Sequence, residues 1–209
     1  AHHPQHDSSE AILPDGSETS FMFADVRHKL HACCHGAHAM IEGLRNLVAA
    51  HDITAQNLAA LSIRVNPRWL KVCDIKAPRT GLEVKFSYVF LAAMVLHHID
   101  TAAYQSYDDS ICGDAGLIAT ASKITVIGDE AISDGAVNVS ADTQTGVRHT
   151  TDFDLMDPID LSVLGPRLVA KASVLIGPAR AEKIWESMDD LDSMPAAQMA
   201  RCLQPLQSA

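Results

Sequence analysis

The sequence predicts an α+β fold in which a mostly antiparallel sheet packs with helices. Short runs of alternating apolar and polar residues, typical of half-buried strands, occur in the middle of the chain. Apolar residues at three- and four-residue spacing indicate helices before, between and after these runs. Strands mixed with terminal helices favour the α+β class. With 209 residues, of which 47% are hydrophobic, the chain can bury a substantial core.

The first half of the chain predicts two helices around a strand. Residues 1–20 are rich in His, Asp, Ser, Pro and Gly without a sustained apolar period, which predicts a flexible N-terminal arm before one domain at 21–209. An amphipathic helix is expected from Gly36 to about His51, followed by a turn and a short helical start. Residues 61–65 alternate as a half-buried strand does, and residues 84–99 are apolar almost all round, as expected of a central buried helix.

The second half predicts a helix, three strands and a helical end. Residues 110–122 favour a helix that leads into a strand at 124–127, and a hairpin is expected from strands at 136–140 and 146–153. Glycine, proline and serine then separate three helical stretches, predicted at 160–176, 179–191 and 195–203. The methionines and leucines at 185–199 follow helical spacing and favour core packing or a subunit contact.

Composition excludes several partners. The formal net charge of −10 removes the general attraction to phosphate backbones, so no nucleic acid partner is expected. The longest apolar run, at 89–96, is far shorter than the roughly 20 residues of a bilayer span, so no membrane is expected either. Five scattered cysteines do not resemble a secreted disulfide framework, and no secretory signal is visible, which together predict a cytoplasmic protein.

The densest polar cluster, residues 27–38, lies just before and at the start of the first predicted helix. Free N–H groups at a helix N-terminus favour an anion, and Lys29 supplies a full positive charge to the same carboxylate. His38, in the first turn, is able to exchange protons near neutral pH. The alternative is that this cluster is a solvated loop without a ligand.

Two further interpretations of this cluster remain open. Cys33, Cys34, His35 and His38 are accepted zinc ligands, although adjacent cysteines rarely direct both sulfurs to one ion. Cys34 near a helix N-terminus and cationic groups is a candidate nucleophile, although cysteines are more often simply buried. No nucleophile elbow, Walker loop or dinucleotide fingerprint occurs, so nucleotide binding is not indicated.

Three blocks, taken together, resemble a known family. They are Lys29-Leu-His-Ala-Cys-Cys-His-Gly-Ala-His38, Ile63-Arg-Val-Asn66 and Pro78-Arg-Thr-Gly-Leu-Glu-Val-Lys-Phe-Ser87. Their order and spacing are similar to the lysine, Cys-Cys and Gly-Thr-His block, the following strand, and the Pro-x-Thr-Gly and Lys-Phe-Ser motifs of MmgE/PrpD proteins. The resemblance covers roughly residues 21–205 and is strongest at 29–93.

Membership would imply the smaller, C-terminal α+β domain of a lyase or isomerase. Known members include 2-methylcitrate dehydratases, cis-aconitate decarboxylases and iminodisuccinate epimerases, so the resemblance implies small di- or tricarboxylate substrates and proton transfer. It implies no metal or organic cofactor. It also implies a partner, a large N-terminal helical domain that completes the active site and that this sequence lacks.

The resemblance assigns roles to individual residues. Lys29 would bind a substrate carboxylate and His38 would bind substrate or transfer a proton, so both are catalytic candidates. Cys34 and Ser87 would line the same cleft as substrate-binding residues. Ala37 stands where the family usually has Thr, and Phe90 where Tyr is frequent, which removes a hydroxyl.

Whether this chain alone is an enzyme stays open at the level of sequence. The first hypothesis is a carboxylate-binding domain that needs the helical domain for turnover. The second is a non-catalytic module for dimerisation or carboxylate binding, in which the partner is a second copy of the chain. A metal- or Cys34-dependent hydrolase is the third.

Overall fold

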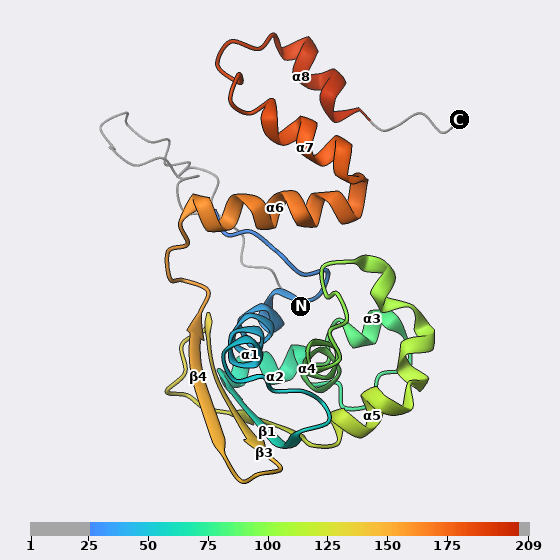
Figure 1. Cartoon of the computed structure of the whole chain (residues 1–209), viewed down its shortest axis with the longest axis vertical. Coiled ribbons are helices and arrows are strands. Elements are labelled where there is room, and N and C mark those ends of the chain that lie inside the picture. Colours follow the sequence, from blue (N-terminus) through green and yellow to red (C-terminus); the bar gives the residue numbers. More distant parts are fainter. Residues whose placement is uncertain (1–25, 205–209) are drawn as a thin grey trace, which may run out of the picture.

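The structure, a computed structural model of the chain, describes residues 26–204. The predicted N-terminal arm at residues 1–20 lies outside the described residues. The α+β class is confirmed, because helices pack with one four-stranded sheet (Figure 1). The strands are β1 (Leu58–Val65), β2 (Ile124–Gly128), β3 (Ala136–Thr143) and β4 (Arg148–Asp154).

The sheet is mixed, with the strand order β2-β1-β3-β4. Strand β3 is antiparallel to both β1 and β4, and the predicted hairpin is the β3–β4 pair. Strand β2 is parallel to β1, with Leu61 opposite Ile124. The expected antiparallel sheet is therefore wrong for this pair. The reason is the long helical connection of residues 66–123, a crossover that returns the chain in the same direction.

Two helices cover one side of the sheet. Helix α1 (His38–His51) packs on β3 and β4, and α4 (Tyr88–Leu96) packs on α1 and β2 (Figure 1). All nine residues of α4 are buried, as expected of the predicted central helix. Its predicted start at residue 84 is wrong, because Ser87 has an extended backbone and its Oγ caps α4 by accepting from the Phe90 N–H at 3.3 Å.

Shorter elements fill the crossover and the approach to α1. The helical start expected after residue 51 is absent, because Asp52 adopts a left-handed backbone (φ 54°) that ends α1 and leads into a turn. The predicted helix at 110–122 is divided by Asp114, which caps α5. These elements are η2 (His35–Ala37), η3 (Pro67–Trp69), α2 (Leu70–Cys73), α3 (Gly81–Val84), η4 (Tyr104–Tyr107), η5 (Asp109–Gly113) and α5 (Ala115–Ala121).

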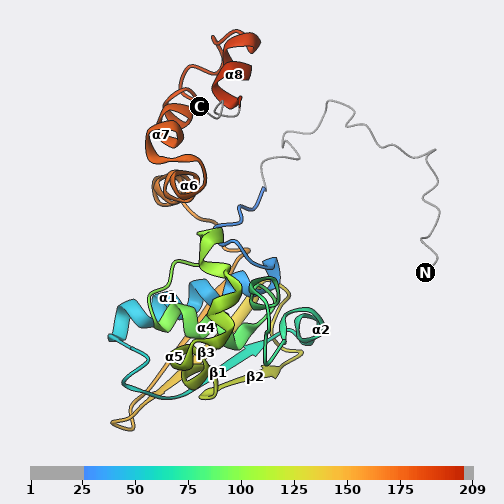
Figure 2. The same cartoon turned by 90° about the vertical axis from the view of Figure 1, so that its right-hand side faces the viewer.

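The sheet and the helices that precede β4, together residues 26–154, are here called the body. Three helices follow β4 and stand beside the body in both views (Figures 1 and 2). They are α6 (Leu161–Ile176), α7 (Pro178–Glu186) and α8 (Ala196–Leu203), here called the C-terminal helices. Gly177, at φ 87°, ends α6, and Pro178 opens α7 immediately afterwards. Helix α7 is shorter than predicted, since turns replace it after Glu186. No helix within residues 26–204 is long and apolar enough to cross a membrane.

Candidate functional site

The candidate site is the loop of residues 29–37 together with the first turn of α1. Backbone hydrogen bonds hold this loop, from Ala32 N–H to the Thr101 carbonyl (2.8 Å) and from Cys34 N–H to the Lys85 carbonyl (3.0 Å). The Tyr88 hydroxyl donates to the Gly36 carbonyl at 2.7 Å. A Cβ at Gly36 would lie 2.3 Å from Trp69, so only glycine fits there. The loop is therefore fixed to the turn before α4 and to the segment after it.

His38 is the first residue of α1 and is almost completely buried. Its ring lies 5.1 Å from that of His31 and 5.6 Å from that of His35, measured between centroids. Its Nε2 has no hydrogen-bond partner among residues 26–204. Burial lowers the pKa of His38 to about 3, and the neighbouring histidines act in the same direction. The free site thus holds a neutral imidazole with an unused ring nitrogen.

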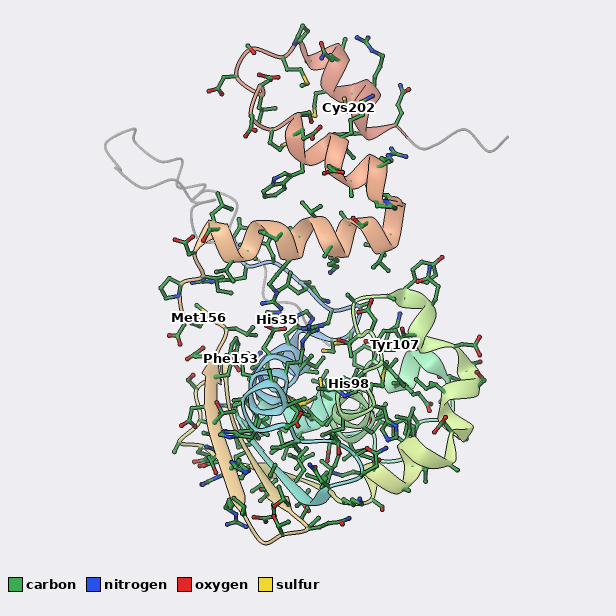
Figure 3. All side chains as sticks on the ribbon, in the orientation of Figure 1. His35, His98, Tyr107, Phe153, Met156 and Cys202 are labelled. Atoms are coloured by element: carbon green, nitrogen blue, oxygen red, sulfur yellow. The ribbon has the colours of Figure 1, made fainter. Side chains whose placement is uncertain are left out.

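His38 lines a pocket of about 400 Å³ between α1 and the chain that leaves β4. Glu42, one turn further along α1, lines the same pocket and so does Leu155. His35 also lines it, and Figure 3 shows His35 on the side of the body that faces α6. His38 therefore forms part of the pocket wall, and its unpartnered Nε2 is itself buried there.

A buried polar network lies beside His38. The Glu42 carboxylate contacts His31 Nε2 at 2.8 Å and the Arg167 guanidinium at 2.7 Å, and His31 Nδ1 lies 2.8 Å from the Thr101 hydroxyl. Burial raises the pKa of Glu42, but the hydrogen bonds from His31 and Arg167 outweigh burial and lower it to about 2. Burial also lowers the pKa of His31. A neutral His31 therefore donates from Nε2 to the ionised Glu42 and accepts the Thr101 hydroxyl at Nδ1.

Lys29 and Cys34 line a second, more open pocket of about 540 Å³. This pocket also receives Lys85 from the turn before α4 and Lys171 from α6. The Lys171 ammonium group donates to the backbone carbonyl of Lys29. His35 lines both pockets, so the loop between Lys29 and His38 separates two adjoining cavities.

The predicted site residues are therefore brought together only in part. Lys29 and Cys34 share one pocket, whereas His38 lines the neighbouring one. Ser87 is fully buried, and its hydroxyl donates to the Ile75 carbonyl at 2.5 Å while it caps α4. This position gives Ser87 a structural role, and its contact with substrate stays a prediction.

The buried thiols beside the loop do not resemble activated nucleophiles. Burial raises the pKa of Cys33 to about 12 and raises that of Cys73 further. Cys34 is half-buried. Among residues 26–204, no three side chains of His, Cys, Asp or Glu are grouped so that they could hold a metal ion.

Sequence reasoning missed the residues that join α6 to this loop. Glu42 follows His38 by four positions, and Lys171 follows Arg167 by four, so each pair shares a helix face. That spacing signals which residues lie together on one helix. It carries no information on which face of α6 meets which face of α1.

A comparison with models of protein families finds a match for the body. The family model described as the MmgE/PrpD C-terminal domain matches residues 31–156, more than half of the chain. The chain belongs to the MmgE/PrpD family, and the resemblance expected from the sequence is confirmed. The matched region ends shortly after β4, so the C-terminal helices follow it. A search of the curated proteins finds no match.

Proposed function

We propose that this chain is the substrate-binding C-terminal domain of a lyase or isomerase for small di- or tricarboxylates, and that a helical domain completes it for turnover. Dehydration, decarboxylation and epimerisation all proceed by proton transfer beside a carboxylate. The observation that carries the proposal is His38, a buried neutral imidazole with an unpartnered Nε2, on the loop that also presents Lys29.

An anionic substrate would change the proton affinity of His38. In the free site, burial and nearby positive charge disfavour the imidazolium form. A bound carboxylate adds the opposite charge and raises the pKa of the imidazole toward the operating pH, where a general base is most effective. His38 would therefore accept a proton when substrate is present, while Lys29 holds a carboxylate in place.

The proposed need for a helical domain follows from the resemblance to the family. Phe90, where relatives often have tyrosine, is buried in α4, lines neither pocket and brings no hydroxyl to the candidate site. Removal of one acid or base group typically costs about 10²- to 10⁴-fold in rate. A helical domain over the two pockets would supply the missing acid and exclude water.

The direct test is thermal unfolding in the presence of citrate, 2-methylcitrate, cis-aconitate and iminodisuccinate. A ligand at 100 times its Kd stabilises the folded state by about 2.7 kcal/mol. We expect at least one acid to raise the Tm of the wild type, and Lys29→Ala and His38→Ala to remove this shift. Lys183→Ala, which changes an exposed lysine on α7, is the control and should keep it. A shift that persists in both site variants would contradict the proposal.

The alternative function is a non-catalytic module for dimerisation or carboxylate binding. Exposed apolar side chains on the C-terminal helices favour this alternative, since such surfaces commonly meet another protein. Light scattering and an activity assay distinguish the two functions. A dimer that persists at all protein concentrations, together with no turnover after a helical domain is added, would favour the non-catalytic module. The most exposed of these side chains are Leu161 and Val163 on α6 and Leu203 on α8.

A further inference from the structure

The pocket that contains Lys29 is unusual in its charge. Three lysines, Lys29, Lys85 and Lys171, line it, and no carboxylate does. The whole chain has a formal net charge of −10, with 26 acidic residues against 16 lysines and arginines. Three ammonium groups beside one cavity in so acidic a protein therefore require an explanation.

The partners of these three lysines are not carboxylates. Within residues 26–204, no carboxylate forms an ion pair with any of them. Lys85 Nζ lies 5.0 Å from the centre of the Tyr107 ring, and Lys171 donates to a backbone carbonyl. Among residues 26–204, the lysines and arginines paired with a carboxylate are Arg64 with Asp129, Arg68 with Asp134, Lys76 with Asp74, Arg79 with Glu83, Arg148 with Asp142, and Arg167 with Glu42.

The positive charges in this pocket repel one another. Burial lowers the pKa of Lys171, and the charge of Lys29 lowers it further. An anion placed among the three groups would relieve this repulsion and would find three ammonium donors. Apolar side chains, Leu82, Phe86 and Leu175, complete the wall.

We propose that Lys29, Lys85 and Lys171 together bind a carboxylate of the polycarboxylate substrate that is distant from His38, so that α6 takes part directly in substrate recognition. This inference rests on the proposed function, since it names a second subsite for the same substrate. The pocket shares His35 with the pocket that His38 lines, so the three lysines lie beside the proposed reacting end of the substrate. Lys171 lies after the region that matches the family model, which ends at residue 156.

The test is isothermal titration calorimetry with citrate, succinate and acetate. If the lysines bind a second carboxylate, affinity should rise from acetate to succinate to citrate. Lys171→Gln should weaken citrate binding by about tenfold or more, because a charge-assisted hydrogen bond is lost, and should change acetate binding little. Lys171→Arg should keep most of the affinity. Lys183→Gln, on the neighbouring helix α7, is the matched control and should bind as the wild type does.

The outcomes separate this inference from the function on which it rests. If Lys29→Ala weakens citrate binding and Lys171→Gln does not, the second subsite is wrong and the proposed function stands. If Lys171→Gln and Lys29→Ala weaken binding while His38→Ala does not, the lysine pocket binds anions and the proposed function fails. Absence of citrate binding by the wild type overturns both. Circular dichroism checks folding, and Lys85→Gln tests the same pocket without altering α6.

Discussion

The body and the C-terminal helices differ sharply in how much apolar surface they bury. Every residue of α4 is buried, whereas α6 and α7 bury one residue each, Gly165 and Ala181, and α8 buries none. Helices in proteins gain most of their stability from packing of an apolar face. The body is therefore held by its own core, and the C-terminal helices depend on few contacts.

Polar contacts connect these two regions. Arg167 pairs with Glu42, and Lys171 donates to the Lys29 carbonyl, both from α6 to the candidate site. Packing within the C-terminal helices is close at one point, where a Cβ at Gly165 would lie 2.8 Å from the Trp185 ring. Because the connection is made of charges beside the pockets, the position of α6 and the binding of an anion are expected to influence each other.

The two regions should differ most in how much a Leu→Ala substitution lowers the free energy of unfolding. Leu44, on α1, is fully buried, so Leu44→Ala should lower the free energy of unfolding by about 3 kcal/mol, through lost burial and a cavity. Leu161, on α6, is 67% exposed, and Leu161→Ala should change the free energy of unfolding by less than about 0.5 kcal/mol. Urea unfolding followed by circular dichroism measures both. Equal costs would show that α6 is packed against a partner in solution.

The next largest effect is expected where the two regions meet. Glu42→Gln leaves the partly buried Arg167 without its counter-ion and should lower the free energy of unfolding by about 1–3 kcal/mol. This value is below the range for fully buried pairs, because Arg167 is partly exposed. Asp142→Asn removes an exposed pair with Arg148, which water and salt screen, and should lower the free energy of unfolding far less. Faster proteolysis after β4 in Glu42→Gln alone would show that the pair holds α6 to the body.

The difference in stability between the wild type and Glu42→Gln should depend on pH. The pKa of Glu42 falls from its usual 4.5 to about 2 in the folded protein. Its stabilising effect is therefore fully present above pH 4.5 and is lost as the pH falls from 4.5 to about 2. The difference between wild type and Glu42→Gln should shrink over this interval, and a constant difference would contradict the ionised state of Glu42.

The local parts of the site were predictable from sequence, and the parts that join distant elements were not. Lys29 and His38 flank one loop, so their motif and the helix start could be recognised together. Helix α1 and the β3–β4 hairpin also depend on local periodicity and turn residues. These features need only information within about twenty residues.

Long-range pairing explains what the sequence did not show. Arg167 is 125 residues from Glu42, and Lys171 is 142 residues from Lys29. The parallel β1–β2 pair depends in the same way on the path of residues 66–123. Periodicity identifies an apolar face, but the face that it meets is decided by packing of the whole chain.

The last prediction tests the neutral state of His38 in the body. Since the folded protein lowers the pKa of His38 from 6.5 to about 3, the unfolded chain binds more protons between these values, and stability falls as the pH falls. Wild type should lose roughly 2 kcal/mol between pH 7 and pH 5 through this one group. His38→Gln should lose correspondingly less, while His28→Gln, which removes an exposed histidine before the same loop, should follow the wild type. Parallel stability curves for wild type and His38→Gln would mean that folding leaves the pKa of His38 unshifted, and would contradict the neutral imidazole. Addition of citrate should then reduce the wild-type loss, because an anion beside the imidazole stabilises its charged form.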